Sequence, residues 1–586
     1  MPDPTLDCVV IGYHEPAFTT VFEQRHGMFE DSGAYRNLLN NSVIVDGRRL
    51  TYMDLLNVML EEVTGRPMAL NAGKLPNLGA CYLKSFLSRR GFRTEMVNFF
   101  TAEQELLETL LQRGTRAVAI TTTFYVEPTP IIEIVRWVRA HSSSVRIIVG
   151  GPHMQDVFRL DGATQQYLFE YMGGDIYIHD PQGEATLAAV LAVLRDGPHE
   201  DLASVPNLAF RAELAEAARH VLLPVYNPAQ PPAAKFRLTP PEREANSLDE
   251  NVIDWNLFPR SLYAPTVQVR TARSCAYKCS FCRFPILAGP LALSSIHVVE
   301  AELRQLHEAG VRNVLFIDDT FNVPLPRFKQ ILRMLIANRF DFEWFSFFRC
   351  AESDDECYRL MADSGCKGVF LGIESGDQQV LNNMDKHASV GRYKEGIRKL
   401  NQAGIMSLAS FIIGFPGETR STVQSTIDFL QETAPTFYRA EIYYHSDKFP
   451  IQKQAVTYGL EGGGYTWRHN TMDWRTACDM VDLIYSTVTN SVICPLYMFD
   501  FWSMPYLHGM GVSLEHIRTF ARVAQKLLVM NFDASPGCDR VRNADIRGEL
   551  VAICREIASD MALAEIAASS GNHAAACGAH NSVSAG

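Results

Sequence analysis

The stretch Ser274-Cys-Ala-Tyr-Lys-Cys-Ser-Phe-Cys-Arg283 places Cys275, Cys279 and Cys282 in a CxxxCxxC spacing. Three thiolates can bind three irons of a four-iron cubane cluster and leave the fourth iron open for another ligand. The serine, tyrosine and lysine between the cysteines are not core residues, so three unrelated buried cysteines are an improbable explanation. The spacing therefore favours an iron–sulfur cluster.

A zinc site is the main alternative for this cysteine stretch. A structural zinc ion needs four protein ligands and usually a CxxC pair. Here Cys350 or Cys366 would have to supply the fourth ligand. Zinc is therefore the less favoured interpretation.

The cysteine stretch directly follows an apolar segment at 267–271 and opens a regular alternation. Further strand-like segments lie at 314–318, 344–349, 368–374, 407–414 and 439–444, and helix-like stretches between them include 298–309, 327–338 and 390–403. Six β/α units in about 180 residues predict a partial (β/α)6 TIM-type barrel over 266–455, with its active site at the carboxyl ends of the strands.

The first part of the chain shows a second alternation of the same kind. Strand-like runs lie at 7–13, 116–123, 145–151 and 174–179, with helix-like stretches at 78–90 and 128–140. Such alternation requires crossover connections, so we expect a mostly parallel, doubly wound Rossmann-like α/β domain over 1–205 with helices on both faces. A ligand of such a sheet lies over the carboxyl ends of its strands. Glycines at those ends are explained equally well by tight turns.

The remaining segments are less regular. Residues 206–265 are predicted to be a proline-rich connector, residues 456–565 a mainly helical C-terminal domain, and residues 566–586 a disordered tail.

Composition limits the function classes. The 586 residues carry 54 basic and 66 acidic side chains, a net charge of -12, which gives no general attraction to nucleic acid or anionic lipid. We expect no signal peptide or transmembrane helix and a cytoplasmic protein with a small-molecule or peptide substrate. Thirteen cysteines in so long a chain do not indicate a disulfide scaffold. Several lie in apolar contexts and are predicted to be core residues: Cys8, Cys81, Cys478 and Cys554.

The barrel region resembles the radical S-adenosylmethionine (SAM) enzymes. An aromatic residue, Phe281, precedes the last cysteine, and motifs follow at the ends of later strands: Phe316-Ile-Asp-Asp-Thr-Phe321, Gly372-Ile-Glu-Ser-Gly376 and Phe411-Ile-Ile-Gly-Phe-Pro-Gly-Glu418. The resemblance implies a 4Fe-4S cluster whose open iron is chelated by the amino and carboxylate groups of SAM. Its SAM-binding residues would be Phe281, Asp318, Asp319, Arg349, Glu374, Ser410 and Gly414.

Most of these residues have a structural alternative. Asp318 and Asp319 could cap a helix instead of binding SAM. Arg349 could pair with the SAM carboxylate or with Asp318. Glu374 is expected to contact the ribose, although a solvated surface carboxylate is also consistent with the sequence. Gly414 and the nearby Gly417 could approach the adenine or only form a turn.

The first domain resembles the cobalamin-binding domain that precedes the barrel in class B radical SAM methyltransferases. The similarity implies cobalamin contacts at Thr121, Thr122, Thr123, Gly150, Gly151, Pro152, His153, Gly183 and Glu184. The chain has no DxHxxG motif, which carries the lower histidine ligand in other cobalamin proteins. We therefore expect a base-off cobalamin to which neither His14 nor His153 is a cobalt ligand.

Several further motifs resemble the P-methyltransferase family of phosphinothricin-type antibiotic biosynthesis. They are Asp7-Cys-Val-Val-Ile-Gly-Tyr13, Asp31-Ser-Gly-Ala-Tyr-Arg36, Gly183-Glu-Ala-Thr-Leu187, Phe437-Tyr-Arg-Ala440 and Thr471-Met-Asp473. The family implies transfer of a methyl group from SAM, through methylcobalamin, to the P-H phosphinate of a demethylphosphinothricin-like intermediate. It also implies an external electron donor such as flavodoxin or ferredoxin. The candidate substrate residues are Arg439, Tyr443 and His445.

Three other functions remain open from the sequence. The acceptor could be an aromatic or sp3 carbon, or the enzyme could use cobalamin for a rearrangement. A non-catalytic, zinc-stabilised binding protein is the alternative from another class, and iron content separates it from the others.

Overall fold

The computed structural model describes residues 5–29, 32–180, 182–214, 235–530 and 539–580. The chain forms two compact units. Unit 1 comprises Met1–Pro16 and Gly73–Leu262, and unit 2 comprises Ala17–Ala72 and Tyr263–Gly586. Within the described residues, no helix is both long and apolar enough to cross a membrane.

Unit 1 is built on a seven-stranded sheet. Its order is β4 (Thr94–Phe99), β1 (Cys8–Tyr13), β5 (Ala117–Thr121), β6 (Arg146–Gly150), β7 (Ile176–Ile178), β8 (Leu208–Arg211) and β9 (Phe236–Leu238). The first five strands are parallel, and β8 pairs antiparallel with both β7 and β9. The expected mostly parallel sheet is confirmed.

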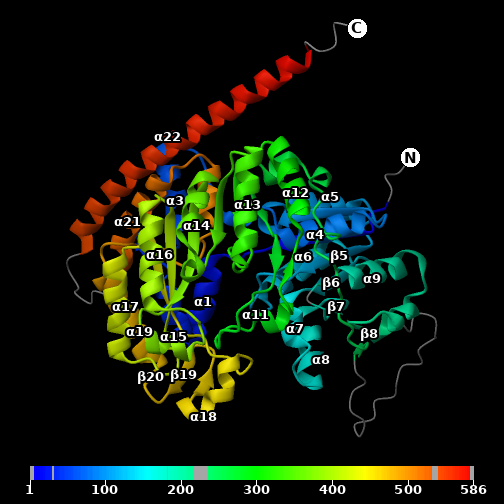
Figure 1. Ribbon diagram of the computed structural model, residues 1–586. Helices are drawn as coiled ribbons and strands as arrows, with labels where there is room; N and C mark the ends of the chain where they lie inside the picture. Colours follow the sequence, from blue (N-terminus) through cyan, green and yellow to red (C-terminus); the bar gives the residue numbers. More distant parts are fainter. Residues whose placement is uncertain (1–4, 30–31, 181, 215–234, 531–538, 581–586) are drawn as a thin grey trace. The chain divides into compact units, whose positions relative to one another are not determined.

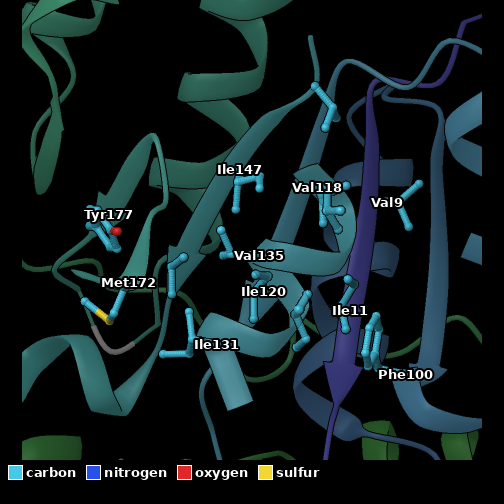
Figure 2. Packing of buried hydrophobic residues seen from close by; sticks show 14 of the residues in the cluster. Val9, Ile11, Phe100, Val118, Ile120, Ile131, Val135, Ile147, Met172 and Tyr177 are labelled. Carbon is cyan, nitrogen blue, oxygen red and sulfur yellow. The ribbon is translucent and has the colours of Figure 1, made fainter. Parts of the chain in front are cut away.

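Helices cover both faces of this sheet, because its strands are apolar on both sides. Figure 2 shows one core, where Val9 and Ile11 of β1 lie with Ile120 and with Ile131 and Val135 of α6 (Thr129–His141). The alternate β1 residues, Cys8 and Val10, belong to a second core with residues of α4 (Leu78–Ser88) and α9 (Glu184–Asp196). Side chains that alternate along a strand point to opposite faces, which explains the unbroken apolar run. The other helices are α5 (Gln104–Gln112), α7 (Pro152–Val157) and α8 (Gly162–Met172).

Unit 2 contains a second parallel sheet of seven strands. Its order is β10 (Thr266–Val269), β13 (Asn313–Phe316), β14 (Glu343–Phe347), β15 (Cys366–Glu374), β16 (Met406–Ile413), β17 (Phe437–Ile442) and β21 (Val492–Ile493). The connecting helices are α12 (Ile296–Glu308), α13 (Leu325–Asn338), α14 (Asp355–Asp363), α15 (Gln378–Asn383), α16 (Val390–Gln402) and α17 (Arg420–Thr433). Consecutive helices contact each other, for example α13 with α14 and α16 with α17 (Figure 1). All six predicted barrel strands are present, and the predicted α/β fold class is confirmed.

The C-terminal part of unit 2 combines a small sheet with helices. Strands β18 (Glu461–Gly463), β19 (Thr466–His469) and β20 (Met472–Asp473) form the sheet. The helices are α18 (Ala455–Tyr458), α19 (Trp474–Thr487), α20 (Ser503–Gly509), α21 (Leu514–Met530) and the long α22 (Asp539–His580), drawn in red in Figure 1. Helix α22 packs on α21 and on α3 (Tyr52–Thr64).

The segment between β1 and α4 folds with unit 2. It contains α1 (Phe18–Phe29), α2 (Gly33–Leu39), the hairpin of β2 (Val43–Val45) with β3 (Arg48–Leu50), and α3. Helix α2 approaches β17 closely: a Cβ on Gly33 would lie 2.9 Å from Ile442 Cδ1 and 2.4 Å from the Tyr465 carbonyl oxygen. Arg36 also pairs with Asp482 of α19 at 2.5 Å. The glycine in the Ser-Gly-Ala-Tyr-Arg motif therefore permits this contact.

The structure differs from the expected domain boundaries at three places. Residues 17–72 belong to unit 2 and not to the N-terminal domain. The supposed connector contributes β8 and β9 to the first sheet, and these strands are too short to show a period in the sequence. Helix α22 continues through 566–580, where we expected a disordered tail. Alanine, the best helix former, is frequent there.

The two halves of α22 should respond differently to the same substitution. Leu550 is 1% exposed against α3 and α21, whereas Leu563 is 63% exposed. Leu550→Ala should lower the free energy of unfolding by about 2–5 kcal/mol through cavity formation, and Leu563→Ala should change it by less than about 0.5 kcal/mol. Urea unfolding of both variants followed by circular dichroism measures the difference. Equal effects would contradict this packing.

Candidate functional site

The cysteine loop begins directly after the first barrel strand. Residues Ala272–Arg273 (β11) pair antiparallel with Ala292–Leu293 (β12) and so close the loop at its base. Ser274 adopts a left-handed backbone conformation, φ 74°, and its hydroxyl donates to the Gly289 carbonyl oxygen at 2.5 Å. Between these anchors the Cys282 amide donates to the Cys279 carbonyl oxygen at 3.0 Å. Cys279 and Cys282 are thus held in one turn, between the two ends of the loop that the Ser274–Gly289 bond joins.

The three thiols are close enough to influence one another's charge. Burial, followed by the other two thiols and Asp319, raises the pKa of Cys282 to about 11. Burial also raises the pKa of Cys279, against the opposing charges of Lys386 and Arg349. Thiolates at these positions therefore need the positive charge of bound metal.

Three thiols in one loop can bind three irons of a cubane cluster. Among the residues that the structure describes, no three His, Cys, Asp or Glu side chains are placed to hold one metal ion. A cubane cluster spreads its three protein ligands over three different irons, so the thiols need to be near one another but not convergent on one point. Cys350 and Cys366, the possible fourth zinc ligands, are buried cysteines of η6 (Cys350–Glu352) and of β15.

The cysteine loop is fastened to two other loops of the barrel. The Ser280 hydroxyl donates to the Asn383 carbonyl oxygen at 3.0 Å, and the Ser280 amide donates to Met384 at 2.9 Å. The Asn383 side-chain amide then donates to the Pro416 carbonyl oxygen at 3.3 Å. Hydrogen bonds therefore join the cysteine loop to the segments after β15 and β16.

A buried ion pair lies beside this junction. Lys386 is 7% exposed, and its Nζ donates to Glu374 Oε1 at 2.7 Å. Burial alone would lower the pKa of Lys386, but the charges of Glu374, Tyr393 and Cys279 raise it above its usual value. Lys386 also lies over the Phe281 ring, 5.4 Å from its centroid. The lysine is therefore a permanent cation next to the cysteine loop.

Glu374 is positioned by an unusual backbone. It ends β15 in a left-handed conformation, φ 70°, and its carboxylate turns back over its own strand, so that a Cβ on Gly372 would lie 2.5 Å from Glu374 Oε1. It is buried, so the surface alternative for this residue is wrong. A ribose contact remains a prediction.

Arg349 supplies a second buried cation. Its guanidinium stacks on the Tyr277 ring of the cysteine loop at 3.7 Å and donates to the Lys386 carbonyl oxygen. The basic neighbour of Asp318 is a different residue, Arg327. Of the two alternatives for Arg349, the pairing with Asp318 is therefore not the one formed.

The two adjacent carboxylates have different surroundings. Asp318 is 2% exposed and accepts three hydrogen bonds: from the amide and hydroxyl of Thr271 and from the Ala272 amide, at 2.5–2.9 Å. Removal of water by the surrounding protein, and the charge of Asp318, raise the pKa of Asp319 to about 7. Helix α13 begins only at Leu325, so neither aspartate caps it. Asp318 fixes the turn before the cysteines, and Asp319 is the carboxylate near Cys282.

The glycine-rich loop after β16 is organised by a buried carboxyl. Glu418 accepts from the Gly414 amide at 2.5 Å, and burial raises its pKa to about 8. Gly414 has φ 91°, and a Cβ there would lie 2.4 Å from the Trp467 ring. Gly417 has φ 93° and a Cβ would lie 2.3 Å from Asn383 Nδ2. Both glycines are therefore required by their packing, whatever contact they make with adenine.

The inner side of β17 carries a row of polar groups. Arg439 Nε donates to the Ser410 hydroxyl at 3.3 Å, and its guanidinium lies 4.9 Å from the Phe370 centroid. Two residues on, burial raises the pKa of Glu441 to about 7, with Arg439 opposing the shift. After the strand, the Tyr443 hydroxyl lies 3.2 Å from His445 Nδ1. Glu441 was not among the predicted substrate residues, although it lies midway between Arg439 and Tyr443, two residues from each.

In unit 1, several predicted cobalamin residues hold the backbone of the sheet edge. The Thr121 hydroxyl donates to the Gly12 carbonyl oxygen at 2.7 Å, and the Thr122 hydroxyl donates to Gly150 at 3.0 Å and accepts from the His153 amide at 3.2 Å. Gly151 has φ 110°, and a Cβ there would lie 2.8 Å from Thr122 Oγ1. Thr123 is exposed beyond them. Pro152 begins α7.

The predicted cobalamin residues after β7 also make contacts within the protein. Gly183, φ 67°, precedes α9, and Glu184 accepts from the side-chain amides of Asn246 and Asn251 at 2.8 and 3.0 Å. His14 has both ring nitrogens engaged, with Thr101 at 3.0 Å and Glu133 at 2.6 Å. Since His14 is buried in these contacts, they support the expectation that it does not ligate cobalt.

Sequence reasoning found the cysteines and the motif carboxylates but missed Lys386, Asn383 and Ser280. Lys386 stands in Asp-Lys-His, which reads as an exposed polar loop. No spacing in the sequence marks these three residues, because their roles depend on contacts between distant loops.

Two family models match parts of the chain. The radical SAM superfamily model matches residues 269–430, and the B12 binding domain model matches residues 68–190. The first covers the cysteine loop and the Glu374, Asp318 and Gly414 motifs, and the second covers the sheet edge with Thr121 and Gly150. The cofactors are therefore a 4Fe-4S cluster, SAM and cobalamin.

Curated relatives match over part of their length. An uncharacterized methyltransferase of Pyrococcus horikoshii is 31% identical over 205 residues, which are 34% of this chain and 45% of the relative. The tryptophan 2-C-methyltransferase of Streptomyces laurentii is 26% identical over 183 residues, 29% of this chain and 31% of that protein. The chain thus spans less than half the length of each of these two relatives.

Solved structures share the fold. The cobalamin-dependent SAM radical enzyme OxsB with aqua-cobalamin bound has a TM-score of 0.53 at 14% identity, over 83% of this chain and 78% of that one. The radical SAM methyltransferase TsrM of Kitasatospora setae, with tryptophan and a SAM analogue bound, has a TM-score of 0.50 at 19% identity, over 68% and 77%.

Removing any one cluster ligand should abolish the cluster. Ala at Cys275, Cys279 or Cys282 should each lose the brown chromophore and most of the bound iron and sulfide after anaerobic reconstitution, because each removes one iron ligand. Cys478→Ala, at a buried cysteine of α19, is the matched control and should keep both. A full four-iron content in any of the three variants would overturn the assignment.

Glu418 should make stability depend on pH in a defined window. Its pKa is about 8 in the folded chain against an ordinary 4.5, so its contribution is complete below about pH 4.5 and is lost as the pH rises through 8. Glu418→Gln cannot ionise and keeps an acceptor for Gly414. Relative to Glu418→Gln, the free energy of unfolding of the wild type should fall as the pH rises from 5 to 8. The fall is at most about 1.4 kcal/mol per pKa unit. Urea unfolding at four pH values tests this, and parallel pH profiles would contradict it.

Proposed function

We propose that this chain, which carries a B12 binding domain followed by a radical SAM domain, is a cobalamin-dependent radical SAM methyltransferase. The observation that carries the proposal is the set of hydrogen bonds that joins the cysteine loop to the segments after β15 and β16. The same chain also matches the models of the radical SAM superfamily and of the B12 binding domain. The matched methyltransferases agree with this activity.

The bound cofactors would supply a transferable methyl group and a radical able to abstract hydrogen from an unactivated centre. The chain's own residues position them. Cys275, Cys279 and Cys282 would hold the cluster. Lys386 and Arg349, both buried cations beside the cysteine loop, would face the carboxylate of SAM, and Asp319 would accept from its amino group. The reaction is thus confined to the carboxyl ends of the barrel strands.

The methyl acceptor we propose is the P-H phosphinate of a demethylphosphinothricin-like amino acid. Support comes from the motif resemblance and from Arg439, a cation on the inner side of β17 that suits an oxyanion. Tyr443 and His445 follow on the same side. The substrate is therefore expected to be a small molecule of natural-product biosynthesis.

A carbon acceptor is the second candidate, and a specific feature favours it. Phe347 lies 5.1 Å from Phe370 and 5.4 Å from Trp502 between ring centroids, so the region around Arg439 is largely aromatic. Such a wall suits a flat acceptor such as an indole.

The cluster needs a one-electron donor, for which we propose a flavodoxin or ferredoxin. We also propose a cytoplasmic location. Eleven cysteines whose side chains the structure describes are free thiols, as is usual in a reducing compartment.

Labelled SAM tests the activity and the acceptor together. With a ¹⁴C-methyl label, the reconstituted enzyme should transfer label to the P-H phosphinate and form about one S-adenosylhomocysteine and one 5′-deoxyadenosine per methyl group, because two SAM molecules play different roles. Tryptophan serves as the carbon acceptor in a parallel reaction.

The outcomes separate the candidates. Label in the indole and none on phosphorus would replace the acceptor and keep the enzyme class. A cofactor-loaded protein that forms a product of unchanged carbon count would indicate a rearrangement. A protein that binds zinc in place of iron would contradict the proposal that this chain is a radical SAM enzyme.

A further inference from the structure

Two residues of β17 carry opposite charges on the same face of the barrel sheet. Arg439 and Glu441 stand two positions apart on this strand, so their side chains point to one face and start about 6.6–6.8 Å apart. Neither forms an ion pair within the residues that the structure describes. Both charges, with that of Asp500, act on the buried thiol of Cys494, so the three charged groups lie near one another.

The guanidinium of Arg439 uses only part of its hydrogen-bonding capacity inside the protein. Its Nε donates to the Ser410 hydroxyl at 3.3 Å, and the group lies 4.9 Å from the Phe370 centroid. Its two terminal nitrogens donate to no residue in the described part of the chain. A guanidinium presents its N–H groups in a fork that matches a carboxylate. Arg439 therefore retains donors for an oxyanion.

Glu441 has a carboxylate oxygen that lacks a donor. Its Oε1 is buried and accepts no hydrogen bond from any residue that the structure describes. Burial raises the pKa of this carboxyl to about 7, while Arg439 and Asn37 of α2 oppose the shift. A buried polar atom without a partner costs free energy. A ligand that brings a positively charged N–H group to Oε1 would remove that cost.

A second acid and several aromatic rings surround the two residues. Asp500 faces the charge of Arg439, and its Oδ1 accepts from the Trp502 amide at 3.0 Å. The indole Nε1 of Trp502 is buried and donates to no described residue. The Trp502 ring lies 5.4 Å from Phe347, which lies 5.1 Å from Phe370, between ring centroids. Separated charges and apolar rings thus occur together inside the barrel.

We infer that Arg439 and Glu441 bind the two charges of a free α-amino acid, Arg439 its carboxylate and Glu441 its ammonium group. One carbon separates these two charged groups of an amino acid, so a single molecule can reach both side chains. The inference rests on the proposed function and deepens it, because it names the part of the methyl acceptor that β17 holds. Both candidate acceptors, the phosphinate and tryptophan, carry this part, and the aromatic rings would pack against the rest.

The test compares each free amino acid with its N-acetyl derivative on the full, reconstituted chain. Demethylphosphinothricin and tryptophan are used with and without the acetyl group, in the presence of SAM and without a reductant, and calorimetry measures each dissociation constant. Acetylation removes the ammonium charge and keeps the carboxylate. Glu441→Gln removes the charge of this side chain at nearly unchanged volume. Glu395→Gln, at an exposed carboxylate of α16, is the matched control.

At least one free amino acid should bind the wild type tenfold or more tightly than its N-acetyl derivative does. Glu441→Gln should raise the dissociation constant of that amino acid at least tenfold, because hydrogen bonds between charged groups are strong. The same variant should change binding of the N-acetyl derivative by less than twofold, since this form has no ammonium group. Glu395→Gln should bind both forms as the wild type does.

A wild type that binds neither free amino acid, or binds the acetylated form equally well, would overturn the inference. Unchanged binding of both forms by Glu441→Gln would also overturn it. An equal loss of both forms would do the same and assign Glu441 a purely structural role. Failure of the proposed function is distinguishable, because the dissociation constants are measured without a reductant, whereas that failure would appear as the absence of labelled product in the reaction with labelled SAM.

Discussion

The site depends on one short chain of hydrogen bonds. Ser280 of the cysteine loop, Asn383 at the end of α15 and Pro416 after β16 are far apart in sequence, and the hydrogen bonds at Asn383 hold these segments at one point. The lack of a side chain at Gly417 follows from the same contact, since Asn383 occupies the space that a Cβ would need. Because neighbouring parallel strands end at the same edge of the barrel, a few bonds between their loops are enough to set the position of the cysteines relative to the rest of the site.

Charge is the second constraint on the site. Cys279, Cys282 and Asp319 have raised pKa values because the protein excludes water from them, while Lys386 and Arg349 lie close by as buried cations. A buried lysine is costly unless it is paired, and Glu374 provides the partner. We propose that this combination of charges serves a cofactor that carries both a carboxylate and an ammonium group. The two adjacent aspartates have different roles in this region. Asp318 fixes a turn of the backbone, and Asp319 lies near the thiols.

Much of this could be predicted from the sequence, and the remainder could not for identifiable reasons. The strands were visible because buried parallel strands are continuous apolar runs, and the cysteines because metal ligands need fixed spacings. The positions of Lys386 and Asn383 in the site cannot be predicted from the sequence, because their burial depends on segments that come together only in the folded chain. The prediction that residues 17–72 belong to the N-terminal domain is wrong. The sequence of a helix such as α2 shows which face is apolar, but it does not show which part of the protein covers that face. Thr122 and Glu184, which stand in the family motifs, also make hydrogen bonds within the protein, Thr122 to the Gly150 backbone and Glu184 to the side chain of Asn246, and the sequence does not show these bonds.

The central claim is that SAM binds the open iron of a cluster held by Cys275, Cys279 and Cys282 in a protein that also carries cobalamin. Low-temperature electron paramagnetic resonance of the anaerobically reconstituted, reduced full chain tests it most directly. We expect a [4Fe-4S]⁺ signal whose g values shift when SAM is added, with a Co(II) signal in the same sample once cobalamin is partly oxidised. A cluster signal that SAM leaves unchanged, or a protein that binds zinc and gives no cluster signal, would contradict the account.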